Sequence, residues 1–340
     1  FGAGRGKSMM RILLVHPEAE LVAVCDKYEP QLEKVREMAS ELGTQVALYK
    51  DFDEFLKHDM DAVVLANYAT EHATFAVKAM NAGKHVMSEV LPSETLAQAI
   101  ELIEAVERTG LVYAYAENYC YRNDTFEMRR RYEACEIGEI TYAEGEYIHD
   151  TASIKPGITY GERNHWRNRT QPFFYCTHSF GPIMTITGRR PVKVVGMQSR
   201  FVSKFYEKAL GPGAAALELV TLDNGALVKS IHGGLKREPG SVNYEIYGDK
   251  GCMETQRFAD RDAQASGIFS KKLNVWKEGD KVCQGELETF FPQKFIEKSL
   301  AESSSGHGGS DFYATHFFIQ KILGKEQGKY SIDVYTAVDM

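Results

Sequence analysis

Short apolar segments separated by helical patterns fill residues 1–121, and this alternation constrains the fold more than any other feature. The apolar segments lack a polar residue at every second position; they are Leu21–Cys25, Ala62–Ala66, His85–Ser88 and Val112–Ala116. Strands of this kind are buried on both faces. A helical pattern that begins at Pro30 and ends before Gly43 separates the first two. Since strands that alternate with helices form a parallel sheet, we expect a doubly wound α/β domain.

From about Asn123 the apolar residues alternate with polar ones, which predicts strands with one solvated face. The segments Ala216–Leu222 and Ala226–Ile231 flank Asp223-Asn224-Gly225, and this pattern predicts a hairpin with a type I′ turn. A helix is predicted at Phe312–Leu323. We therefore expect two domains, residues 1–121 and 122–340, the second an α/β domain with a large, mostly antiparallel open sheet.

Composition excludes several classes of protein. The 340 residues carry 40 Lys+Arg against 47 Asp+Glu, a net charge of −7 without a basic block. This predicts no nucleic-acid partner and no binding to an anionic membrane. The apolar segments are far shorter than the ~20 residues of a membrane span. Six cysteines lack any C-x-x-C spacing, which is typical of reduced thiols in a cytoplasmic protein.

A glycine-rich turn, Gly2-Ala3-Gly4-Arg5-Gly6, opens the first helical pattern, and Asp26 follows 20 residues after Gly6. Glycines let backbone N–H groups approach a pyrophosphate, and an acidic residue about 20 positions on binds the ribose. The sequence thus predicts a Rossmann domain that binds NAD through Gly2, Gly4, Arg5, Gly6 and Asp26. Asp26 would repel a 2′-phosphate, whereas Arg5 and Lys27 leave NADP possible. The motif departs from the usual one in two ways: no strand precedes the turn, and Lys7 replaces a third glycine. Because the turn follows Phe1 at once and the chain stops at Met340 without an obvious terminator, we expect both chain ends to be trimmed.

The segment from Ala62 to Pro92 resembles the Gfo/Idh/MocA family of sugar and inositol oxidoreductases. The matching residues are Asn67, His72, Gly83, Lys84, His85 and Glu89. The resemblance continues through Glu117 and Asn118 and into the glycine-rich stretch around His307. It implies an NAD(P)-binding Rossmann domain, with Asn67, His72, Glu89, Glu117 and Asn118 near the cofactor. It also implies a second domain that holds the substrate and assembles into a homodimer or homotetramer.

Val90 departs from the family pattern. The family carries a lysine after the glutamate, and that lysine reaches towards nicotinamide and substrate hydroxyl. Valine has no proton to donate, so other groups must handle the proton, or the chemistry differs.

A second cluster of polar and aromatic residues lies between Glu146 and Pro182. Strand alternation places Tyr147 and His149 on one face, and a helical Tyr175–His178 segment would place these two residues on one face. His178 can accept a hydroxyl proton, and tyrosines can donate to ring oxygens or relay protons. The proposed catalytic residues are His178, Tyr175, Tyr147 and His149. The proposed substrate-binding residues are Asp150, His165, Trp166, Arg167 and His307, with Trp166 as an apolar platform for a sugar face.

This cluster is similar to one branch of the same superfamily, the NAD-dependent glycosidases of the α-N-acetylgalactosaminidase type. Glu117, Tyr147, His149, Tyr175 and His178 match positions of that branch's active site. Phe174 stands where ordinary family members have an aspartate, four residues before the histidine.

Three functions remain open at this point. The first is an NAD(P)-dependent sugar or cyclitol oxidoreductase, whose hydride chemistry belongs to the nicotinamide. The second is a glycoside hydrolase that holds NAD and oxidises its substrate transiently. The third is an NAD-responsive binding protein without turnover. The histidines and Asp150 have no tight ligand spacing, so no metal is predicted.

Overall fold

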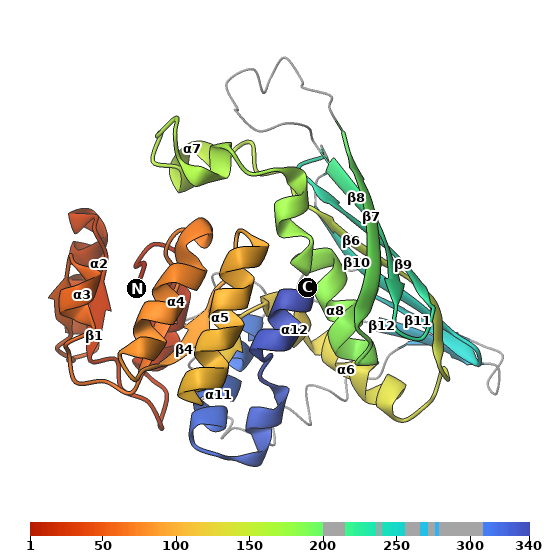
Figure 1. Ribbon diagram of the computed structural model, residues 1–340, viewed down its shortest axis with the longest axis horizontal. Coiled ribbons are helices and arrows are strands. Elements are labelled where there is room, and N and C mark those ends of the chain that lie inside the picture. The colour runs from red at the N-terminus through yellow and green to blue at the C-terminus, as the bar shows by residue number, and fades with distance from the viewer. Residues whose placement is uncertain (200–214, 236, 238–239, 256–265, 271–275, 279–308) are drawn as a thin grey trace. The chain divides into compact units, whose positions relative to one another are not determined.

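The computed structural model describes residues 1–199, 215–235, 237, 240–255, 266–270, 276–278 and 309–340 (Figure 1). The chain divides into two compact units. Unit 1 comprises Phe1–Asn118 and Phe291–Val338, and unit 2 comprises Tyr119–Phe290 and Asp339–Met340. This differs from the expected division at residue 121, because the C-terminal segment belongs to the first unit. Helix α11 (Ser310–Ile322) is buried nearly all round and packs on α1 and β4 of that unit.

All described strand pairs of unit 1 are parallel, as predicted. β1 (Ala23–Cys25) pairs with β2 (Ala47–Tyr49), and β4 (His85–Ser88) lies between β3 (Ala62–Leu65) and β5 (Tyr113–Tyr115). The helices of the unit are α1 (Lys7–Leu13), α2 (Glu29–Glu41), α3 (Phe52–Phe55), α4 (His72–Asn81), α5 (Leu96–Thr109), α11 and most of α12 (Val334–Asp339). The sequence correctly predicts β1, β3, β4, β5 and α2 to within a few residues, whereas β2 was not predicted.

Local capping explains where helix α5 begins and ends. The Thr95 hydroxyl accepts the backbone N–H of Gln98 at 3.2 Å, which satisfies a free donor of the first turn. Gly110 takes a left-handed conformation (φ 64°) after the last turn, which is the usual glycine signal for a helix end.

Unit 2 is built on an eight-stranded sheet in the order β13-β12-β11-β10-β6-β9-β8-β7. Its described neighbours pair antiparallel except β6 with β9, which are parallel. The strands are β6 (Ile140–Ile148), β7 (Pro191–Gln198), β8 (Ala215–Leu222), β9 (Leu227–Gly233), β10 (Ser241–Gly248), β11 (Gly251–Thr255), β12 (Ser266–Ser270) and β13 (Trp276–Glu278). The mostly antiparallel open sheet is therefore confirmed.

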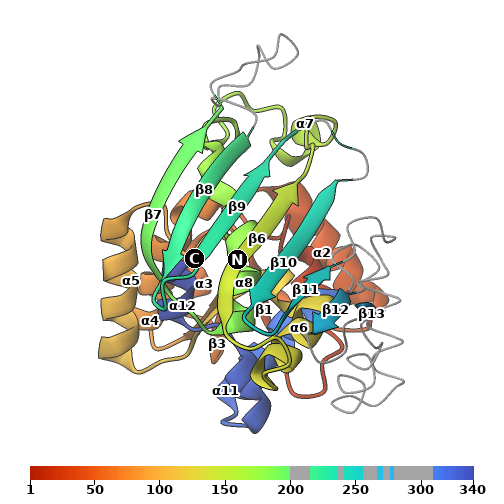
Figure 2. The same ribbon diagram turned by 90° about the vertical axis from the view of Figure 1, so that its right-hand side faces the viewer.

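Helices cover one face of this sheet (Figures 1 and 2). α8 (Thr177–Thr187) packs against β6, β9 and β10, and α6 (Asn123–Glu133) packs against α8. The core between them includes the fully buried Met128, Ile183, Val228 and Ile246. α7 (Lys155–Ile158) and the short 3-10 turns Asn118–Tyr121, Trp166–Asn168 and Pro172–Tyr175 complete the described helical segments of the unit.

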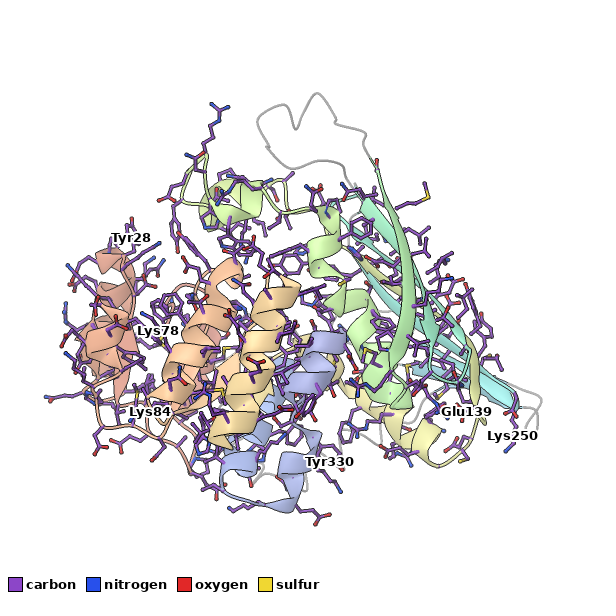
Figure 3. All side chains as sticks on the ribbon, in the orientation of Figure 1. Tyr28, Lys78, Lys84, Glu139, Lys250 and Tyr330 are labelled. Atoms are coloured by element: carbon purple, nitrogen blue, oxygen red, sulfur yellow. The ribbon has the colours of Figure 1, made fainter. Side chains whose placement is uncertain are left out.

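The β8–β9 hairpin is present, but its turn is not the predicted type I′. That type needs positive φ at both central residues, and of the turn residues only Gly225 has it (φ 87°). The Gly225 N–H donates to the Leu222 carbonyl, and the Leu222 N–H donates to the Ala226 carbonyl. The Asn224 side chain donates to Glu139, which is labelled in Figure 3, at 2.8 Å. The loop thus has three residues with a left-handed glycine last, and Asn224 ties it to β6.

None of the helices in the described ranges is long and apolar enough to cross a membrane. The five cysteines in these ranges carry free thiols.

Candidate active site

The glycine turn of unit 1 forms a backbone cradle that side chains would fill. Gly2 has a φ of +93°, and a Cβ atom there would lie 2.4 Å from the backbone of Ala66. A Cβ atom on Gly6 would lie 2.6 Å from the Gly2 carbonyl oxygen. Glycine is required at both positions, since real Cβ atoms do not approach backbone so closely. The residues present therefore fit a pyrophosphate held by backbone N–H groups.

Asp26 lies directly beside this turn, at the end of β1. The Ala3 N–H donates to its Oδ2 at 2.7 Å, and the Tyr28 N–H donates to its Oδ1 at 2.9 Å. The sequence spacing thus brings turn and carboxylate together, and the two backbone donors fix the carboxylate orientation.

Arg5 is surrounded by carboxylates. Its guanidinium lies 2.7 Å from Glu89 Oε1 and donates twice to the buried Asp311 carboxylate, at 3.0 Å each. It also donates to the Ser8 hydroxyl at 2.7 Å, and Asn118 donates to Asp311 at 3.2 Å. Although Asp311 lies in the first turn of α11, Gly309 occupies the cap position of that helix, and the Asp311 side chain binds Arg5. A bidentate pair of this kind orients both partners.

Other predicted cofactor residues form the frame around this cluster. His72 is buried and donates from Nδ1 to the Leu91 carbonyl at 2.8 Å, so it holds the segment that follows Glu89. Asn67 donates to Glu71 at 3.2 Å. Glu117 is fully buried after β5. Direct contact of these residues with NAD remains a prediction.

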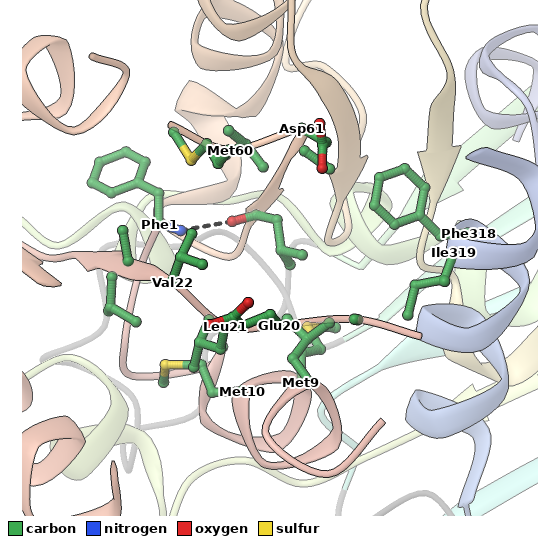
Figure 4. Close-up of a pocket in the computed structure, with 18 of the residues that line it drawn as sticks. Phe1, Met9, Met10, Glu20, Leu21, Val22, Met60, Asp61, Phe318 and Ile319 are labelled. Carbon is green, nitrogen blue, oxygen red and sulfur yellow. Dashed lines mark hydrogen bonds between the residues drawn. The ribbon is translucent and has the colours of Figure 1, made fainter. Parts of the chain in front are cut away.

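A groove of unit 1 lies between β1 and β3, and Gly2 and Gly6 of the glycine turn are part of its lining (Figure 4). Its lining is apolar or acidic, with Met10, Val22 and Asp61 among the residues drawn. Outside the glycine turn such a lining disfavours phosphates, so the turn and Asp26 are the residues here that fit the dinucleotide.

Unit 2 gathers the predicted catalytic residues around His178, near the start of α8. The His178 ring centroid lies 4.7 Å from that of Tyr147 and 5.3 Å from that of Tyr175. Tyr119, which the sequence argument did not single out, also lies 4.7 Å away. In the sequence, the only indication of a role for Tyr119 is that it directly follows Glu117 and Asn118, which match the family.

Tyr147 and His149 share a face, as strand alternation predicts. The Tyr147 hydroxyl lies 2.9 Å from His149 Nδ1, at the end of β6. A phenol and an imidazole at hydrogen-bond distance can pass a proton between them.

Arg167 orders the other side of this cluster. Its Nη1 donates to the Tyr175 hydroxyl oxygen at 2.8 Å, which leaves the phenolic hydrogen free to point to a different acceptor. The guanidinium lies 4.4 Å from the Trp166 ring centre, and the Arg167 N–H donates to the buried His165 at 3.2 Å. Trp166 is only 5% exposed, so it supports Arg167 and does not form the open platform expected for a sugar.

The remaining predicted substrate residues are Asp150 and His307. Asp150 accepts the Ala152 N–H at 3.0 Å and shapes its own turn. His307 lies outside the described residues. Among the described residues, no three His, Cys, Asp or Glu side chains are placed to hold a metal ion.

Comparison with known proteins identifies the family of the amino-terminal domain. Residues 1–117 match the Gfo/Idh/MocA family model, described as an oxidoreductase family with an NAD-binding Rossmann fold. The amino-terminal part of the chain is therefore an NAD-binding Rossmann domain of the Gfo/Idh/MocA oxidoreductase family, and the expected resemblance is confirmed.

The curated relatives point to the glycosidase branch. A glycosyl hydrolase family 109 protein of Stenotrophomonas maltophilia is 23% identical over 98% of this chain and 81% of its own length. A glycosyl hydrolase family 109 protein of Phocaeicola vulgatus is 27% identical over 91% of this chain and 71% of its own length.

Solved structures share the fold. Scyllo-inositol dehydrogenase from Lactobacillus casei, crystallised with NAD(H) and scyllo-inositol, has a TM-score of 0.71 at 18% identity, covering 98% of this chain and 90% of that one. The WlbA dehydrogenase from Bordetella pertussis, in complex with NADH and UDP-GlcNAcA, has a TM-score of 0.71 at 17% identity, covering 99% and 90%.

Proposed function

We propose that this protein uses NAD to exchange a hydride with a hydroxyl-bearing carbon of a sugar, sugar derivative or cyclitol. The observation that carries the proposal is the His178 cluster, in which an imidazole meets three phenols in a chain with an NAD-binding domain. Bound NAD would supply the hydride acceptor.

The side chains of the His178 cluster would bind and transfer the protons of the reaction. His178 accepts the hydroxyl proton while the carbon is oxidised. Tyr147, whose ring centroid lies 4.7 Å from that of His178, would take up this proton at its hydroxyl oxygen and release its own hydrogen to His149 Nδ1, 2.9 Å away. Tyr175, whose oxygen already accepts from Arg167, donates its hydrogen to a substrate oxygen.

NAD is preferred to NADP in this proposal. Asp26 places a carboxylate where a 2′-phosphate would need a cation. Arg5, the nearby cation, is already compensated by Glu89 and Asp311.

A second candidate is NAD-dependent glycoside cleavage. It is favoured by Val90, which replaces the family lysine, and by the glycosyl hydrolase names of the relatives. Oxidation of a ring hydroxyl would acidify the neighbouring C–H, and loss of that proton would expel the aglycone. Water would then add to the double bond, and return of the hydride would restore the hydroxyl. The first step is common to both candidates.

One set of assays separates the candidates. Purified protein is incubated with NAD and a panel of sugars and cyclitols, and in parallel with nitrophenyl glycosides of several sugars and both anomers. Net NADH formation supports the oxidoreductase, whereas nitrophenol release without net NADH supports the glycosidase. NAD binding with neither NADH nor nitrophenol formed would contradict both enzymatic candidates. It would support the third function, an NAD-responsive binding protein without turnover. His178→Ala must abolish the activity found, and His58→Ala, a histidine of unit 1 bonded to Tyr49, serves as the control.

We also propose self-association through the uncovered side of the unit 2 sheet. Val195 of β7 pairs with Leu219 of β8, and Met197 pairs with Leu217. These four side chains are 57%, 43%, 77% and 37% exposed, respectively. Adjacent exposed apolar residues of this kind mark interaction sites, and a second copy of the chain would cover them in a homodimer or homotetramer.

A further inference from the structure

A proline inside α8 removes the helical hydrogen bond at His178. In an α-helix the N–H of each residue donates to the carbonyl four positions earlier. The residue four positions after His178 is Pro182, which lies inside the helix and has no N–H. The His178 carbonyl therefore needs a donor from elsewhere, because a buried carbonyl without a partner is costly.

Tyr244 of β10 supplies that donor. Its hydroxyl donates to the His178 carbonyl oxygen at 2.6 Å, and its side chain is fully buried. A phenylalanine would fill the same apolar space. Packing therefore accounts for the ring of Tyr244 but not for its hydroxyl group.

Gly145 makes this contact possible. It pairs directly with Tyr244 across β6 and β10, and a Cβ atom on Gly145 would lie 1.9 Å from the Ser179 carbonyl oxygen. The missing side chain thus lets the first turn of α8 approach the sheet beside the tyrosine. The next residue of α8 contacts strand β9, which neighbours β6. The Ser179 hydroxyl lies 2.8 Å from the Ser230 hydroxyl and 3.2 Å from His232 Nδ1.

We propose that Tyr244 is a positioning residue for the His178 imidazole, its hydroxyl replacing the N–H that Pro182 lacks. The turn that carries His178 is held by this bond and by the Ser179 contacts to β9. The imidazole consequently keeps its place between Tyr119 and Tyr147. The part of this proposal that concerns activity rests on the proposed function, whereas the part that concerns His178 geometry does not.

The test compares Tyr244→Phe with a rescue variant and a matched control. In Tyr244→Phe we expect kcat to fall about 10-fold or more, with KM changed less than about 3-fold, because small displacements of a reacting group cost that much. The His178 side-chain NMR signal is expected to shift as well. Adding Pro182→Ala restores an N–H that can donate to the His178 carbonyl, so the double variant should recover most of the lost kcat and the wild-type signal. Tyr247→Phe, on the same strand with its hydroxyl bonded to Glu245, should change neither.

An unchanged His178 signal in folded Tyr244→Phe would overturn the proposal, and so would a double variant no better than the single one. If Tyr244→Phe does not fold, recovery of folding and of the His178 signal by Pro182→Ala supports the proposal, and failure to recover overturns it. Should the wild-type protein show no turnover, the NMR signal and its rescue still decide the role of Tyr244, while the proposed function fails separately.

Discussion

The glycine turn of unit 1 and the His178 cluster of unit 2 are stabilised by different forces. The turn is fixed by close backbone contacts and by charged side chains. Asp26 accepts two backbone N–H groups, and Arg5 forms ion pairs with Glu89 and Asp311. The His178 cluster is fixed by aromatic packing and by hydrogen bonds of tyrosine and serine hydroxyls, one of them from Arg167 to Tyr175. The dinucleotide side thus keeps its charges paired, whereas the His178 cluster relies mainly on hydroxyl groups, which can change hydrogen-bond partners.

The largest effect is expected for His178→Ala. Loss of the proton acceptor should lower kcat by about 10²- to 10⁴-fold, the usual contribution of general base catalysis, with the NAD dissociation constant changed less than about 2-fold. Steady-state assays and NAD titration by calorimetry measure the two effects. A parallel loss of NAD binding would contradict the separation of roles between the two regions.

Glu218→Gln is expected to change how unit 2 responds to pH. Burial raises the pKa of Glu218 to about 7 and lowers the pKa of its neighbour His232 to about 4, so both are neutral in the folded chain between about pH 4 and about pH 7. The folded carboxyl keeps its proton above pH ~4.5, where the unfolded one loses it. The stability that Glu218 contributes is therefore full below about pH 4.5 and is lost as the pH rises to about 7.

The glutamine variant should remove this loss, which is on the order of 3 kcal/mol. Relative to wild type, its free energy of unfolding should rise between about pH 4.5 and about pH 7 in guanidinium titrations. Glu245→Gln, on strand β10 of the same sheet, is the control. Parallel pH dependences for wild type and Glu218→Gln would refute the buried neutral carboxyl.

Asp311→Asn tests the ionic side of the comparison. Arg5 loses one of its two carboxylates, and the glycine turn should become less well ordered. We expect the NAD dissociation constant to rise about 10-fold, as for loss of a charged hydrogen bond, with kcat at saturating NAD unchanged. Asp53→Asn, which breaks an exposed pair with Lys78, should have almost no effect because surface pairs contribute little. Equal effects of the two variants would show that the Arg5 cluster has no special role.

The smallest effect is expected on the uncovered face of the sheet. Met197→Ala removes apolar area from the proposed contact between copies and should raise the dimer dissociation constant about 5-fold, or about 1 kcal/mol. Val194→Ala, on the opposite face of β7 where it pairs with Val220, should leave association unchanged. Sedimentation velocity distinguishes the two. A wild-type chain that is monomeric at all concentrations would exclude this contact.

The sequence predicted those features that depend on neighbouring residues. Apolar runs located β3 and β4, and the glycine turn with its distant aspartate located the contact between Ala3 and Asp26. Alternation correctly placed Tyr147 beside His149.

Features that depend on contacts between distant residues were not predictable. The pairing of Arg5 with Asp311 spans 306 positions, and no local pattern distinguishes it from a helix cap. Tyr244 reaches His178 from a strand 66 positions away. The turn after Asp223 was misjudged because one asparagine–glycine pair suits both turn types, and strand register decides between them.

The most direct test of the central claim is a crystal structure of the protein with NAD and a substrate sugar or cyclitol. We predict that a substrate hydroxyl lies within hydrogen-bond distance of the His178 imidazole, with the hydrogen on its carbon directed at the nicotinamide ring. A His178 imidazole more than about 10 Å from the reacting carbon, with protein packed between them, would contradict the account.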